Sequence, residues 1–112
     1  MKKNTLLLVA TALALAVTSK VLAADGAAIY SDTCAQCHGD DGKGKTTKGR
    51  RLKIRDFSDP KVQASFTDAE AIKAVEDGIK NTNNVILMKG YKDDYSDAEV
   101  KAVVAYFRTL KK

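Results

Sequence analysis

The sequence predicts a small, all-α domain with three or more helices. Two stretches, residues 67–77 and 96–110, each open with a capping-box pattern and continue with apolar residues three and four positions apart, as on one helix face. Period-two apolar alternation, which would indicate strands, nowhere exceeds a few residues. The chain has 112 residues and no internal repeat, so we expect one domain.

The N-terminus has the pattern of a secretory signal peptide. Two lysines precede an apolar run from Leu6 to Val17, and small residues lead to Ala23, where a signal peptidase would cut. The run is about a dozen residues, shorter than the ~20 that span a bilayer, so cleavage is favoured over an uncleaved membrane anchor. We expect residues 1–23 to be removed and residues 24–112 to form the mature domain.

The mature chain is predicted to begin with a short helix from Asp25 to Cys37. Tyr30 lies one turn before Cys34 on the same helix face. Glycines and polar residues follow and predict a loop without strands as far as Arg51. The only proline, Pro60, is interpreted as a turn residue ahead of the next helix.

Two further helices are predicted from their capping patterns. A middle helix over residues 67–77 begins with Thr67 and Glu70 and ends before Gly78, where a left-handed residue is expected. The last helix begins at Ser96 and carries an apolar stripe made of Val100, Val103, Val104, Phe107 and Leu110.

Residues 34–38 form a C-x-x-C-H motif, which is typical of c-type haem attachment: the two thiols bind the haem vinyl groups and the histidine binds iron. Cys34 and Cys37 are the only cysteines, and His38 is the only histidine. A zinc site would need a fourth such ligand, and a redox dithiol would be expected beside a βαβ pattern that this sequence lacks. The predicted cofactor is one covalently attached haem c.

Met88 is the only methionine after Met1 and lies in the turn-rich segment Ile79–Tyr95, between the middle and last helices. A methionine at any one site usually serves packing, but loops of this kind present ligands. We therefore predict that the Met88 thioether binds the iron, with Lys89, water or a vacant site as alternatives.

The mature chain as a whole resembles the class I cytochrome c family, in its small bacterial monohaem form. The residues that carry the resemblance are, in order, Gly26, Tyr30, Cys34, Cys37, His38, Met88 and Tyr106. The resemblance implies helices wrapped around one haem, with His38 and Met88 as axial iron ligands. It also implies that Gly26 and Tyr30 pack against Tyr106, and that the chain resides in the periplasm, since bacteria attach haem covalently outside the cytoplasm.

The sequence departs from this family in two places. No proline follows His38 to accept its imidazole hydrogen bond through the backbone carbonyl, so a carbonyl among Gly49–Leu52 is expected to do so instead. Lys89-Gly90-Tyr91 follows Met88 where relatives often have proline, which predicts a more mobile loop and a weaker iron–sulfur bond.

A basic stretch runs from Lys43 to Arg55, with no acidic residue and with the basic residues Lys43, Lys45, Lys48, Arg50, Arg51, Lys53 and Arg55. We predict that it steers redox protein donors and acceptors to the haem edge, although a solvated loop is the simpler alternative. Nucleic-acid binding is disfavoured, because an exported haem protein rarely meets nucleic acid. No extended interface is evident, so a monomer is expected.

The resemblance implies a soluble one-electron carrier rather than an enzyme. One alternative is a gas or redox sensor in which Met88 dissociates from the iron and admits a small ligand. Another is a haem subunit of a larger redox enzyme, although a single haem and a single histidine predict no pocket for substrate chemistry.

Overall fold

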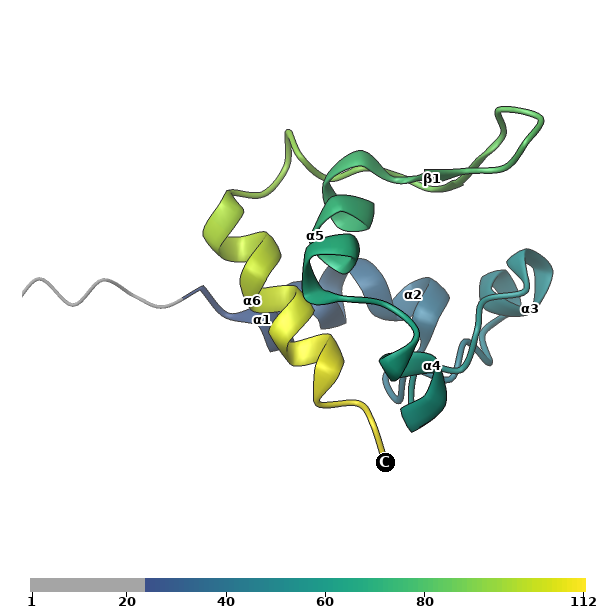
Figure 1. The fold of residues 1–112 in the computed structure, drawn as a ribbon, viewed down its shortest axis with the longest axis horizontal. Helices are drawn as coiled ribbons and strands as arrows, with labels where there is room; N and C mark the ends of the chain where they lie inside the picture. The colour runs from purple at the N-terminus through teal and green to yellow at the C-terminus, as the bar shows by residue number, and fades with distance from the viewer. Residues whose placement is uncertain (1–23) are drawn as a thin grey trace, which may run out of the picture.

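The computed structural model describes residues 24–112, so the predicted signal peptide lies outside the described residues. Helices dominate, which agrees with the predicted all-α class (Figure 1), and none of those described is long and apolar enough to cross a membrane. The elements in chain order are α1 (Gly26–Ile29), the π-helical turn η1 (Tyr30–Cys34), α2 (Ala35–His38), α3 (Thr47–Leu52), α4 (Pro60–Ala64), α5 (Asp68–Asp77), β1 (Ile79–Lys80), β2 (Ile86–Met88) and α6 (Asp97–Arg108).

The predicted first helix is present as the continuous run α1–η1–α2. Asp25 caps its start by accepting a hydrogen bond from the Ala28 amide, at 3.1 Å, and Gly39 ends it with a positive φ of 81°. The π-helical turn was not predicted: the Ala35 N–H donates to the Tyr30 carbonyl, five residues back. Such wide turns often occur at functional sites, and this one ends on Cys34.

Helix α6 forms as predicted and provides most of the core. Ser96 and Glu99 form a complete capping box, and the stripe buries Val100, Val103 and Val104. This helix packs against α1 and α5 (Figure 1). Tyr30 of η1 is only 2% exposed and belongs to the same core cluster as Val103 and Val104. Few apolar side chains are fully buried, which is expected of a small domain whose interior is completed by a cofactor.

The predicted packing of Gly26 and Tyr30 on the last helix is confirmed. A Cβ on Gly26 would overlap the carbonyl group of Ala102, so the backbones of α1 and α6 touch there. The rings of Tyr30 and Tyr106 lie with centroids 5.2 Å apart in a tilted arrangement.

Two short helices occupy segments that had been assigned to a loop and a turn. Thr46 caps α3 by accepting from the Gly49 amide at 2.9 Å, and Lys53 ends that helix in the left-handed region. Pro60 is the first residue of α4, behind the cap Asp59, where a missing N–H costs nothing. Both helices are too short and too polar for an apolar period to reveal them.

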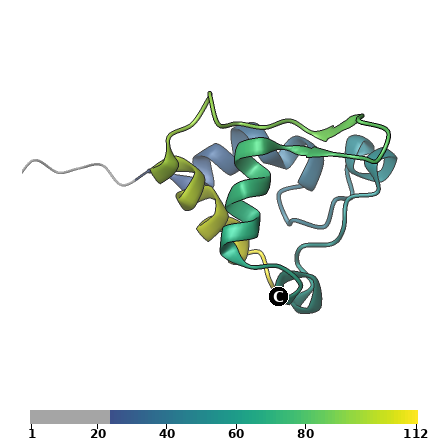
Figure 2. The ribbon, with the colours of Figure 1, turned by 45° about the horizontal axis from the view of Figure 1, so that its top comes forward.

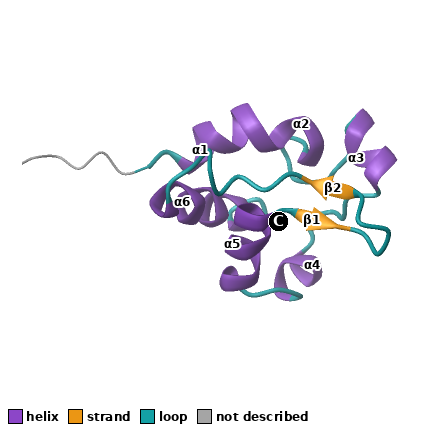
Figure 3. Cartoon of the chain, turned by 90° about the horizontal axis from the view of Figure 1, so that it is seen from above, coloured by secondary structure: helices purple, strands orange, loops and turns teal. Residues whose placement is uncertain are grey.

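The middle helix forms as α5, capped by Thr67, but the segment after it contains a β-hairpin that had not been predicted. Strands β1 and β2 pair antiparallel with Ile79 opposite Met88, and the side chain of Asn81 closes the turn by accepting from the amides of Asn83 and Val85. Strands of two and three residues cannot display an alternation pattern. The hairpin extends from α5 toward α3 (Figures 2 and 3).

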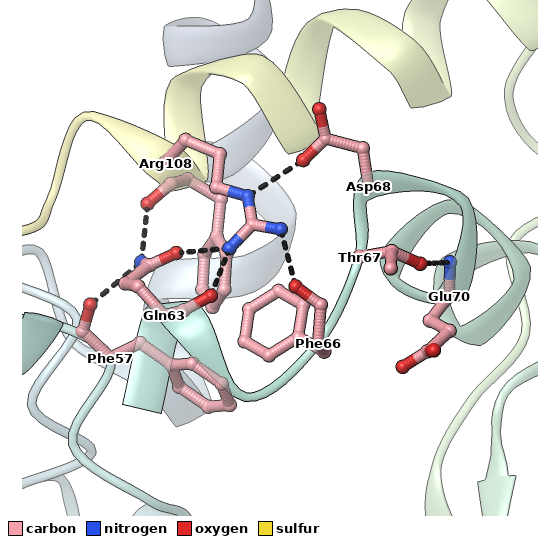
Figure 4. Close-up of polar contacts among 8 residues, drawn as sticks. Phe57, Gln63, Phe66, Thr67, Asp68, Glu70 and Arg108 are labelled. Atoms are coloured by element: carbon pink, nitrogen blue, oxygen red, sulfur yellow. Dashed lines mark hydrogen bonds and ion pairs between the residues drawn. The ribbon is translucent and has the colours of Figure 1, made fainter. Parts of the chain in front are cut away.

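A polar cluster joins α4, the start of α5 and the end of α6 (Figure 4). The Arg108 guanidinium donates to the backbone carbonyl of Gln63, to the Phe66 carbonyl at 2.8 Å and to Asp68 at 2.7 Å. The buried Gln63 amide in turn donates to the carbonyls of Phe57 and Phe107. The cluster thus fixes three segments that carry phenylalanines.

Candidate haem-binding site

Two adjoining cavities, of about 270 Å3 and about 440 Å3, separate the α1–α2 run from the hairpin. They share Cys34, His38 and Met88 in their linings, and Cys37 lines the larger one. The structure therefore brings together all four predicted site residues, although Met88 is fifty residues from His38 in the chain. The smaller cavity is lined mainly by apolar side chains, and α5 and α6 contribute more of them than any other element.

His38 is held between aromatic rings. Phe57 and Phe107 meet the imidazole edge-on, with centroids at 5.6 and 5.7 Å. Burial lowers the pKa of His38, which favours the neutral ring with a lone pair for a metal. Its Nδ1 is buried and has no hydrogen-bond partner among the described residues.

The carbonyl expected from Gly49–Leu52 does not pair with His38 in the structure. The reason is that this segment is helical. The Gly49 carbonyl accepts the Ile54 amide at 2.9 Å, and the Arg50 carbonyl faces the Lys53 amide at 3.3 Å. These groups serve the end of α3, which leaves the imidazole without that partner.

Three successive carbonyls at the end of the C-x-x-C-H motif are each fixed by a hydrogen bond. The Thr46 hydroxyl donates to the Cys37 carbonyl at 2.7 Å, and the Gly44 amide donates to that of His38 at 2.7 Å. The buried Tyr30 hydroxyl donates to the Gly39 carbonyl at 2.6 Å. These contacts orient the motif without using its side chains.

The sequence analysis assigns no role to Thr46, and considers Gly49 only for its backbone carbonyl. A Cβ on Gly49 would clash with the carbonyls of Gly44 and Cys37, so only glycine allows α3 to lie this close to the motif. The one signal in the sequence was a capping residue, Thr46, three positions before a glycine.

The two cysteines form no disulfide with each other, and both are half-buried. Burial, together with the nearby Cys37, raises the pKa of the Cys34 thiol to about 11, so this group is protonated at neutral pH. The cavities are thus lined by two thiols, one imidazole and one thioether. These side chains are soft or uncharged donors for a metal or cofactor.

The Met88 segment is anchored on its α5 side. A Cβ on Gly78 would lie 2.5 Å from the Met88 carbonyl oxygen, and the φ of Gly78 is 76°. Beyond Met88, the Tyr91 amide donates to the Val75 carbonyl at 2.8 Å and the Lys92 amide to that of Glu76 at 3.1 Å. These contacts hold the chain on both sides of Met88 against the end of α5.

Comparison with known proteins identifies this arrangement. The family model described as cytochrome c oxidase, cbb3-type, subunit III matches residues 21–107. The chain belongs to this family of c-type cytochromes. No curated protein sequence matched the chain.

Solved structures agree with this assignment. The cytochrome is similar to the KustC0563 c-type cytochrome, with 34% identity and a TM-score of 0.68, covering 79% of this chain and 99% of that one. A tyrosine-to-phenylalanine variant of that protein is 32% identical, with a TM-score of 0.65 and coverage of 78% and 99%. Since these neighbours are c-type cytochromes, the resemblance to small class I cytochromes c is confirmed.

A c-type cytochrome carries covalently attached haem c, and the cavities of this cytochrome fit that group. Their apolar walls suit a porphyrin, and the thiols and the uncommitted imidazole suit its vinyl groups and iron. Arg55 is the only basic side chain, apart from the neutral His38, that lines both cavities. It lies over the Phe57 ring at 5.3 Å and donates to the Ser65 hydroxyl at 3.2 Å.

Proposed function

We propose that this cytochrome is a one-electron carrier in which Cys34 and Cys37 would form the thioether bonds to haem, and His38 and Met88 would bind its iron. The observation that carries the proposal is the convergence of Cys34, His38 and Met88 on the same cavities. Haem iron, when bound there, supplies the ferrous–ferric couple. The function rests on family membership and on this geometry together.

The proposed ligands set the direction of the redox tuning. A neutral thioether from Met88 favours ferrous iron, so histidine–methionine ligation gives a higher reduction potential than ligation by anionic groups. The apolar lining, including Phe57 and Phe107, excludes water and disfavours the extra positive charge of ferric iron. Arg55, at the edge of both cavities, would pair with a haem propionate.

For its cellular place, we propose export to the periplasm with removal of residues 1–23. The composition of that segment and the need to attach haem outside the bacterial cytoplasm support this proposal. Residues 24–112 would then be the mature monohaem domain.

Partners would dock where the basic stretch Lys43–Arg55 meets the hairpin. Lys48, Lys53 and Arg55 line the larger cavity together with Leu87 of β2. The hairpin also exposes apolar side chains, namely Ile79, Val85, Ile86 and Leu87. An apolar patch beside a purely basic stretch suits a redox partner whose own docking surface has acidic residues around an apolar centre. Two copies of this basic surface would repel each other, so the proposal includes a monomer.

The family model also supports a second candidate, a haem subunit of a larger oxidase. Its description names subunit III of a cbb3-type cytochrome c oxidase. We place the carrier first because the similar solved structure is described as a c-type cytochrome, and 99% of that chain is covered. Size-exclusion chromatography of the detergent-solubilised native protein separates the two: a carrier elutes at the size of its own domain, whereas a subunit elutes with its complex.

Visible spectra of the holoprotein test the ligand assignment. We expect the ferric form to show the weak far-red methionine-to-iron band, and the ferrous form not to bind carbon monoxide. In a Met88→Ala variant the band should disappear and carbon monoxide should bind, because the sixth position is then open.

A Met88→Ala variant that keeps the far-red band would refute Met88 as a ligand. A wild-type protein without the band, which binds carbon monoxide readily, would refute the carrier proposal and support the gas or redox sensor. An Ile86→Ala variant is the matched control, since it shortens a neighbouring exposed side chain and should behave as the wild type.

A further inference from the structure

The residues proposed to hold the haem and its iron lie on two separate parts of the chain. Cys34 and His38 belong to the helical run of residues 26–38, whereas Met88 lies at the end of β2. The thioether at Cys34 would fix the haem to the helical run. The strength of the methionine bond therefore depends on how firmly the Met88 segment is held against that run.

The segment after Met88 is a compact unit. The amides of Asp94 and Tyr95 both donate to the Tyr91 carbonyl at 3.0 Å, and Lys89 pairs with Asp94 at 3.0 Å. The rings of Tyr91 and Tyr95 lie 6.1 Å apart. Residues 88–95 therefore form one connected unit, so a contact at Tyr95 also acts on the Met88 end of it.

One hydrogen bond joins this unit to the helical run. The hydroxyls of Thr33 and Tyr95 lie 2.5 Å apart, both half-buried. Within residues 24–112, no other hydrogen bond or ion pair connects residues 24–38 with residues 79–95. The backbone ties of the unit lead instead to α5, at Val75 and Glu76.

Thr33 is adjacent to Cys34, and Tyr95 is seven residues beyond Met88. We propose that the Thr33–Tyr95 pair is a latch that positions the methionine ligand: it holds residues 88–95 against the haem-attachment helix and so opposes displacement of Met88 from the iron. This inference rests on the proposed ligation by Met88. Neither residue would touch the iron, so both are positioning residues.

The test is displacement of the methionine by imidazole in the ferric holoprotein, followed by the loss of the far-red band. One hydrogen bond contributes about 1 kcal/mol, so Tyr95→Phe and Thr33→Val should each raise the association constant for imidazole about fivefold. The double variant should gain no more than either single variant, because both changes break the same bond. Thr33→Ser, which keeps the hydroxyl, should bind imidazole as the wild type does.

Tyr106→Phe is the matched control, since the Tyr106 hydroxyl has no hydrogen bond to the described residues. The latch is refuted if Tyr95→Phe and Thr33→Val bind imidazole with wild-type affinity while the wild type shows the far-red band. It is also refuted if their effects add in the double variant. A wild type without the band refutes the proposed ligation first and the latch with it.

Discussion

Gly26 shows how a single residue sets the distance between two helices. It is fully buried in α1, and a Cβ there would lie 2.5 Å from the carbonyl carbon of Ala102 in α6. Glycine ordinarily weakens a helix interior by ~0.5–1 kcal/mol relative to alanine. Here it permits a contact of two backbones, and Tyr30 can then reach Tyr106 one turn later.

We therefore predict that Gly26→Ala destabilises the holoprotein, by about 1–3 kcal/mol, although the same change in an exposed helix would stabilise it. The overlap is with backbone atoms, which cannot rotate away. Denaturant unfolding, followed by far-ultraviolet circular dichroism, measures the effect. A variant as stable as the wild type would show that α1 and α6 can separate without cost.

At the scale of elements, the end of α6 is fixed by Arg108 rather than by apolar packing alone. Its guanidinium lies over the Phe66 ring at 4.3 Å and donates hydrogen bonds to the backbone carbonyls of Gln63 and Phe66 (Figure 4). Phe66 and Phe107 both line the smaller cavity. The hydrogen bonds of Arg108 therefore hold these two lining residues, which come from different parts of the chain, in place relative to each other.

Replacing Arg108 by methionine should cost about 2–3 kcal/mol of unfolding free energy, because partly buried carbonyls lose a charged donor. The companion variant Asp68→Asn should cost less than about 1 kcal/mol, since its side chain is largely exposed and other acceptors remain. Thermal unfolding of the two holoproteins compares them. Equal losses would mean that the ion pair, and not the carbonyl contacts, stabilises the end of α6.

At the scale of the whole molecule, positive charge is concentrated on the side of α3. The chain has a formal net charge of +5, and seven of its basic residues lie between Lys43 and Arg55, where no acidic residue occurs. A local field of one sign raises the encounter rate with anions and is screened by salt. This face also bears the exposed apolar side chains of the hairpin, such as Ile86.

Electron transfer from the ferrous protein to hexacyanoferrate(III) tests this field. The second-order rate constant should fall as ionic strength rises. The double variant Lys48→Gln/Lys53→Gln should slow the reaction about two- to tenfold at low salt. The control Lys101→Gln/Lys112→Gln removes the same charge from α6 and the C-terminus. If the control slows the reaction as much, net charge rather than the basic stretch is responsible.

Local signals in the sequence predicted several elements correctly. The capping residues Thr67 and Ser96 and the stripe through Val103 located α5 and α6, because a helix start and a helix face depend on residues within one or two turns. The same reasoning failed for α3 and the hairpin, which are too short to show a period. The prediction of a carbonyl partner for His38 was wrong for a related reason: α3 was not foreseen, and the Gly49 and Arg50 carbonyls accept hydrogen bonds at its end.

The sequence by itself determined the chemistry of the site. Its only cysteines, its only histidine and its one internal methionine left a single candidate for each haem ligand, and the C-x-x-C-H spacing named the cofactor. Only the tertiary structure decided how these groups are held. Thr46 and Gly44 donate hydrogen bonds to carbonyls of the motif, Arg55 lines both cavities, and Tyr95 lies beside Thr33. The physical reason is that ligand identity is a property of side chains in a short motif, whereas their orientation depends on contacts between residues far apart in the chain, such as the 62 positions that separate Thr33 from Tyr95.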